Sequence, residues 1–190
     1  MVSWTRRDLS RKASQIGETL PYELAKYTTI IVERLKSNWL RIDDGIAQQF
    51  QIEVFAFMLH LFDRRSFEVF GPEGRDVFQN ELISVMRPVV AQVLCSGSSR
   101  HASFDWVMDT YNERQLEYGE FKKELPEKGE GLKGTLWWEF SKKMAFGLIH
   151  EQKSSEDFAK YFTQLNTLIM GENSDLWRIY LDTIDVLTAQ

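Results

Sequence analysis

Residues 46–64 of this 190-residue chain have the sequence IAQQFQIEVFAFMLHLFDR. On a helical wheel at 100° per residue, the apolar side chains of this stretch cover roughly two thirds of the circumference. The polar remainder is a narrow stripe that contains Gln49, Glu53, His60 and Asp63. A helix this apolar packs on several sides at once. We therefore expect it at the centre of the fold, with other helices around it.

Outward from this stretch, Gly, Pro, Ser and Asp clusters divide the chain into further segments with helical period. The chain has only 4 prolines, and no part of it combines sustained alternation with Asn-Gly or Asp-Gly turns, so strands have little support. The pattern predicts an all-α fold, a compact multi-helix array or bundle of about seven helices. The expected helices run from Thr19 and Pro21 to about Ser37, Asp43 to Phe70, Val77 to Leu94 after a Gly71–Gly74 turn, Ser103 to Phe121, Leu132 to His150, Ser154 to Met170, and Ser174 to Leu187.

The first residues are basic, with Arg6, Arg7, Arg11 and Lys12 and no apolar run after them. We therefore do not expect a secretory signal, and the Arg and Ser bias only weakly resembles an organellar transit peptide. We expect residues 1–17 to form a basic N-terminal segment, either flexible or packed, and residues 18–190 to form a single all-α domain.

The composition limits which kinds of partner and which cellular compartment we expect. Lys plus Arg is 23 and Asp plus Glu is 28, a formal net charge of −5, which disfavours general nucleic-acid binding. The lone Cys95 cannot form an internal disulfide, as fits a reducing compartment. The longest apolar run, Ile52 to Phe62, is about half of what a bilayer span needs. We expect a soluble, cytoplasmic protein without a membrane span; an organelle is the alternative compartment.

The stripe on the central helix is the first candidate site. Glu53 and His60 are seven residues apart, or two helical turns, so both point the same way. A carboxylate and an imidazole that face one space can bind a metal or share a proton. The candidate ligand-binding residues are Gln49, Glu53, His60 and Asp63, with Glu139 and His150 as contributions from another helix. The simpler interpretation, which we favour, is the solvated edge of a well-packed helix; the metal stays unknown and no cofactor is clearly implied.

An acidic row follows helical spacing at Asp109, Glu113 and Glu117. It lies opposite the apolar stripe of its helix, where solvated charge belongs, so we expect it to be exposed rather than to hold a hard cation. On the same helix, Arg114 flanks the apolar side, and we expect its stem to lie against the core.

The segment Gly129–Gly134 is a formal G-x-G-x-x-G. A dinucleotide site needs a strand before this motif, and the residues before it are charged and contain Pro126. We therefore expect a flexible loop.

Aromatic residues make up 13% of the chain, and most of them fall on apolar helix faces. Trp106 and Leu116 instead fall on the acidic face, where neither is needed for folding. The adjacent Trp137 and Trp138 are 100° apart on a helix, so one can face the core while the other reaches a neighbour. Because Trp and Tyr are preferred anchors of interfaces, these four residues are the candidate interface.

The sequence favours a non-enzymatic protein that acts by protein–protein interaction or homo-oligomerisation through aromatic-rich helix faces. It shows no Gly-x-Ser-x-Gly and no readable Ser-His-Asp or Cys-His arrangement, which removes positive support for an enzyme without excluding one. The alternative is a small-molecule or metal-binding helical protein, enzymes included, with an internal site around Glu53 and His60.

Overall fold

The computed structural model describes residues 4–37, 42–95, 104–121, 123–124, 133–149, 155–170 and 174–189. In this part of the chain the protein is helical and has no strand, so the predicted all-α class is confirmed. None of the described helices combines the length and apolarity that a membrane span requires. The helices are α1 (Arg6–Ser37), α2 (Asp44–Cys95), α3 (Phe104–Gly119), α4 (Leu136–Ile149), α5 (Ser155–Met170) and α6 (Asp175–Thr188).

Helix α2 is divided at Gly71, whose backbone has φ 72° and ψ 179°. This confirms the predicted break at Gly71–Gly74 and separates a first half, residues 44–70, from a second half, residues 72–95. A positive φ is accessible to glycine without the steric cost that a Cβ imposes. Counting the two halves separately, the helices agree with the predicted number.

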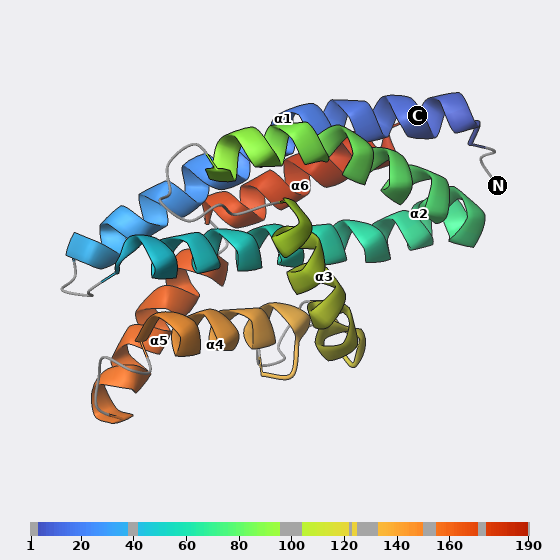
Figure 1. Cartoon of the computed structure of the whole chain (residues 1–190). Coiled ribbons are helices and arrows are strands. Elements are labelled where there is room, and N and C mark those ends of the chain that lie inside the picture. The colour runs from blue at the N-terminus through green and yellow to red at the C-terminus, as the bar shows by residue number, and fades with distance from the viewer. Residues whose placement is uncertain are drawn as a thin grey trace.

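The first half of α2 lies at the centre of the molecule (Figure 1). After Gly71 the chain reverses, and the second half of α2 runs back beside α1, with α6 in the same group of helices. Helices α4 and α5 lie on the opposite side of the first half, and α3 crosses it at an angle. Every residue from Ile52 to Asp63 is buried, as expected for a helix covered on all sides.

Helix α1 begins at Arg6, so the predicted start at Thr19 and Pro21 is wrong. A stripe of buried side chains continues through the proline at helical spacing. A proline inside a helix costs about 3 kcal/mol, and the burial of this stripe against α2 and α6 offsets that cost. The stripe consists of Leu9, Ala13, Ile16, Leu20 and Leu24.

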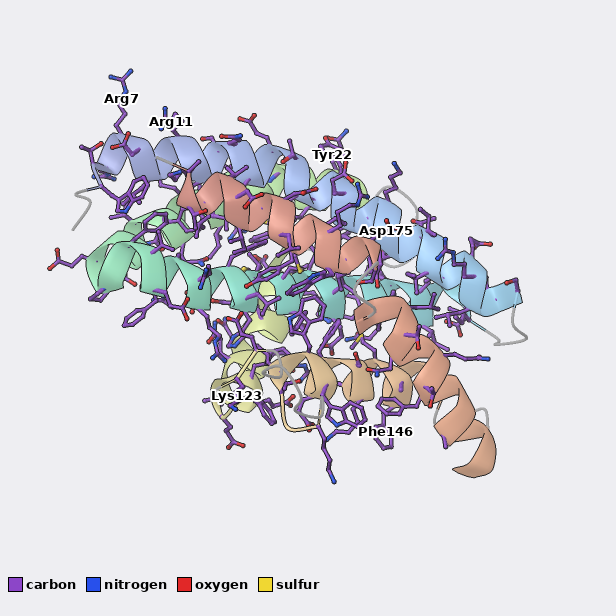
Figure 2. All side chains as sticks on the ribbon, turned by 180° about the vertical axis from the view of Figure 1, so that it is seen from behind. Arg7, Arg11, Tyr22, Lys123, Phe146 and Asp175 are labelled. Atoms are coloured by element: carbon purple, nitrogen blue, oxygen red, sulfur yellow. The ribbon has the colours of Figure 1, made fainter. Side chains whose placement is uncertain are left out.

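Lys12 connects the start of α1 to the end of α6. Its Nζ donates hydrogen bonds to the carbonyl oxygens of Val186, at 2.8 Å, and Ala189, at 2.5 Å. A cation at a helix C-terminus also interacts favourably with the helix dipole. Of the predicted basic segment, residues 6–17 are therefore part of α1, while Arg7 and Arg11 point outward from the molecule (Figure 2).

Residues 121, 123 and 124, which follow α3, contact three other helices. Arg64 of α2 donates to the Phe121 carbonyl oxygen at 2.5 Å. The Leu136 amide at the start of α4 donates to the Lys123 carbonyl oxygen at 2.9 Å, and Glu124 accepts a hydrogen bond from the Tyr180 hydroxyl at 3.0 Å. These contacts attach the segment that follows α3 to the first half of α2, to the start of α4 and to α6.

At Gly17, α1 approaches the second half of α2 closely. A Cβ at this position would lie 2.9 Å from Cγ1 and 3.0 Å from Cβ of Val85. Both atoms belong to a stiff, β-branched side chain, so they cannot easily move aside.

We expect Gly17→Ala to lower the free energy of unfolding by about 1–3 kcal/mol, because overpacking outweighs the gain in helix propensity. Gly147→Ala is the matched control, since no atom lies within 4 Å of its added Cβ, and it should stabilise the protein by up to about 1 kcal/mol. Urea denaturation of both variants measures the difference. If both substitutions raise the free energy of unfolding by the same amount, α1 does not approach α2 closely at Gly17.

Candidate functional site

Three of the four side chains in the polar stripe on the first half of α2 are buried, and Gln49 is half-buried. Glu53 is 4% exposed, His60 2% and Asp63 8%. The favoured interpretation of a solvated edge is therefore wrong. The reason is that α3 and the second half of α2 supply charged side chains that cover the stripe.

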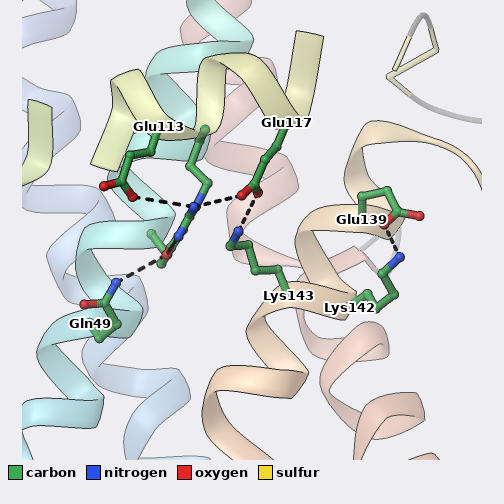
Figure 3. Close-up of polar contacts among 8 residues, drawn as sticks. Gln49, Glu113, Glu117, Glu139, Lys142 and Lys143 are labelled. Carbon is green, nitrogen blue, oxygen red and sulfur yellow. Dashed lines mark hydrogen bonds and ion pairs between the residues drawn. The ribbon is translucent and has the colours of Figure 1, made fainter. Parts of the chain in front are cut away.

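Glu53 is held by Arg114 of α3. The guanidinium binds both carboxylate oxygens, with Nη2 to Oε1 at 2.6 Å and Nε to Oε2 at 2.9 Å. Gln49 adds a hydrogen bond to Oε1 at 3.2 Å, and Glu117 accepts from Arg114 Nη1 at 3.1 Å (Figure 3). The side chain of Arg114 is 14% exposed, as the sequence predicts for its stem. Two parallel hydrogen bonds between a guanidinium and a carboxylate are strong and directional.

Asp63 is held by Arg75, which comes from the second half of α2. The Nε of Arg75 donates to Oδ1 of Asp63 at 2.6 Å. The same guanidinium donates to exposed Asp76 at 2.7 Å, and the hydrogen bond that Arg75 donates to Asp63 raises the pKa of Arg75. The two halves of α2 are therefore joined by an ion pair close to the Gly71 turn.

The side chain of His60 packs against an aromatic residue. Its ring packs against the ring of Tyr118 in an edge arrangement at 5.3 Å between centroids. Burial, which disfavours the charged imidazolium, is the main cause that lowers the pKa of His60 to about 4. The nearby charge of Arg64 also lowers this pKa, and the charge of Asp63 raises it by less. The imidazole is therefore neutral at neutral pH.

The structure does not bring the other proposed ligands to this stripe. Glu139 forms an ion pair with Lys142 on α4, and His150 lies outside the described residues. Within the described ranges, no group of three or more His, Cys, Asp and Glu side chains could hold a metal ion. In the acidic row, Asp109 and Glu113 are exposed, as expected. Of the Gly129–Gly134 motif, only the end is described, with Gly134 in a turn at φ 86°.

The four candidate interface residues fall in different environments. Trp137 is a core residue at 1% exposure, whereas Trp138 is half-buried and packs edge-on against Phe162 of α5 at 5.0 Å. Trp106 is also half-buried and packs against the core. Leu116 alone among the four is fully open to solvent, at 82% exposure.

Two pockets adjoin each other along α4, and the first of them is lined by Leu116. One, of about 510 Å³, lies between α3 and α4 and is lined by Leu116, Phe121, Lys143 and Phe146 among others. The second, of about 430 Å³, lies between α4 and the start of α2. Its apolar lining residues are Ile46, Phe50, Met144 and Phe146. We name the two pockets together the Leu116–Phe146 surface.

Phe146 and Lys143 line both pockets and join them into one surface. Phe146 is 48% exposed and lies at the edge of the molecule away from α1 (Figure 2). Lys143 reaches across from α4 to Glu117 of α3, with Nζ to Oε2 at 2.5 Å (Figure 3). The sequence does not single out Phe146, because on a largely apolar helix the pattern does not say which apolar residue is half exposed.

A comparison of this chain with protein-family models, with curated proteins and with solved structures found no match. Conclusions about function therefore depend on the chemistry of the surfaces described above.

Removing one partner of the Glu53–Arg114 pair should be strongly destabilising. We expect Arg114→Met to cost about 3–5 kcal/mol, because it leaves a buried carboxylate without its guanidinium. The double change Glu53→Met/Arg114→Met should cost less than the single one, since no uncompensated charge remains. Denaturant unfolding measures both. The matched control is Arg178→Met, which removes an exposed ion pair with Asp175 and should cost at most about 1 kcal/mol; a loss of that size for Arg114→Met would contradict the buried pair.

His60 should make stability depend on pH. Its pKa falls from 6.5 in the unfolded chain to about 4 in the folded protein. As the pH drops from 6.5 toward 4, the unfolded chain binds a proton that the folded protein does not, so stability is lost by at most about 1.4 kcal/mol per pH unit. In His60→Leu this part of the dependence should disappear. Urea denaturation at a series of pH values in this range measures the free energy of unfolding of both proteins. If that free energy changes with pH in the same way in His60→Leu and in the unmodified protein, the prediction is wrong.

Proposed function

We propose that this protein is a non-enzymatic binding module that recognises another protein through the Leu116–Phe146 surface. The observation that carries the proposal is Leu116, which is 82% exposed at the edge of a pocket that it shares with Phe146. Burying a leucine side chain contributes about 1.5–3 kcal/mol, and a partner that covers Leu116 would gain this free energy. Exposed apolar side chains grouped around pockets are typical of interaction sites.

Other exposed apolar side chains lack these surroundings. Phe67 is 55% exposed and Leu181 43%, but neither lines one of the two pockets of this surface. Single exposed apolar residues are common on protein surfaces and need no partner. This contrast makes Phe67 and Leu181 suitable controls.

The alternative, a small-molecule or metal site around Glu53 and His60, has less support. Arg114 and Arg75 already neutralise the two carboxylates of the stripe, and His60 packs on the Tyr118 ring. A buried carboxylate with a well-oriented guanidinium has its charge compensated. Gln49 and Glu53 line the 430 Å³ pocket, but both oxygens of the Glu53 carboxylate are bound by Arg114, so the contacts of the stripe support a structural role.

The test is quantitative capture of proteins from cell extract on three immobilised forms of the chain. We expect Leu116→Ser/Phe146→Ser to lose, by about tenfold or more, partners that the unmodified protein captures, because truncating interface anchors has effects of this size. The control Phe67→Ser/Leu181→Ser should retain them. Circular dichroism and urea unfolding verify that both variants are folded. If the two variants capture the same proteins in the same amounts, the proposal is wrong.

A further inference from the structure

The helix face around Leu116 has a regular charge pattern. Asp109 and Glu113 precede Leu116 by seven and three residues, and Glu120 follows it by four. At this spacing the four side chains share one face of α3, and all four are exposed. An apolar side chain thus lies in a row of carboxylates.

These carboxylates are not neutralised by neighbouring cations. Within the described part of the chain, Asp109 and Glu120 form no ion pair. Glu113 is 3.8 Å from Arg114, but that guanidinium is already bound on two sides by Glu53. The surface therefore has negative charges that a partner can meet.

The lysines of the same surface do not cancel this surplus. Lys143 is paired with Glu117 at 2.5 Å, and Lys142 is paired with Glu139. Each lysine is thus matched by its own carboxylate (Figure 3). The net charge of the Leu116–Phe146 surface, taken with the α3 row, is negative.

We infer that the partner presents a basic amphipathic helix. Its apolar side chains cover Leu116 and enter the pocket lined by Ile46, Phe50 and Met144, and Lys or Arg residues on its flanks meet the α3 carboxylates. This is the geometry in which a groove binds an amphipathic helix, with apolar anchors at i, i+3 or i+4 and i+7. The inference rests on the proposed function and adds the chemistry of the partner to it.

The same charge pattern disfavours other occupants. In a two-fold contact between copies of this chain, each surface meets its own copy, so the acidic row would face another acidic row and repel it. Nucleic acid and anionic membranes carry negative charge and are repelled as well. A basic segment of a different protein is the occupant that the charges favour.

The test uses two synthetic peptides and fluorescence anisotropy. The first peptide is an amphipathic helix with leucines on one face and lysines beside them; the second replaces every lysine with glutamate. We expect the lysine peptide to bind the full chain, with an affinity that falls as salt is added, and the glutamate peptide not to bind. Salt weakens exposed charge pairs by screening.

Variants of the chain locate the binding. Asp109→Asn/Glu113→Gln/Glu120→Gln should weaken binding of the lysine peptide by about tenfold, the sum of three exposed charge pairs. The matched control Glu18→Gln/Glu23→Gln/Glu73→Gln removes three exposed carboxylates from α1 and α2 and should leave binding unchanged. Leu116→Ser should also weaken binding of the lysine peptide.

Several results would overturn the inference. The inference is wrong if both peptides bind equally or if the lysine peptide does not bind. It is also wrong if the two triple variants weaken binding equally, or if sedimentation shows a dimer that Leu116→Ser dissociates. If any of these occurs while Leu116→Ser/Phe146→Ser still loses partners in the capture experiment, the proposed function stands and only the basic partner is wrong. If the capture experiment fails, the surface itself is wrong.

Discussion

The first half of α2 has no side exposed to water between Ile52 and Asp63, and the rest of the structure depends on this constraint. Three polar side chains lie in that buried stretch, and an ionised carboxylate is costly to bury without a partner. Glu53 is compensated by Arg114 of α3, and Asp63 by Arg75 beyond the Gly71 turn. The central helix therefore requires a cation at two defined places, and those cations fix where α3 crosses and how α2 returns.

The inward position of Arg114 determines what α3 exposes. Leu116 follows Arg114 by two residues, which is about 200° on a helix. When Arg114 points at Glu53, Leu116 points away from the core, and it is 82% exposed. The exposed leucine is thus a geometric consequence of the buried ion pair. The Lys143–Glu117 pair then joins α4 to the same helix and brings Phe146 beside Leu116.

The sequence predicts the helices well, because apolar period and breakers are local signals. It predicts the break at Gly71 and a cap at Asn173 or Ser174, and Ser174 accepts from the Trp177 amide at 3.1 Å. It fails where the deciding partner is distant. A helical wheel shows that Glu53, His60 and Asp63 share a narrow stripe, but not whether water or a guanidinium covers it. The start of α1 was placed at Pro21 because the local signal of a proline outweighed a longer apolar stripe.

The Leu116–Phe146 surface also differs from a flexible apolar patch in its energetics. Two parts of it are held before any partner arrives: α3 by the buried Glu53–Arg114 pair, and Phe121 by the hydrogen bond that its carbonyl oxygen accepts from Arg64. Each side chain or loop that becomes ordered on binding loses conformational entropy, which weakens the affinity. A surface whose backbone is already ordered avoids most of this loss. The buried ion pair, which adds little to stability compared with an apolar pair of similar shape, thereby holds in place the surface on which binding depends.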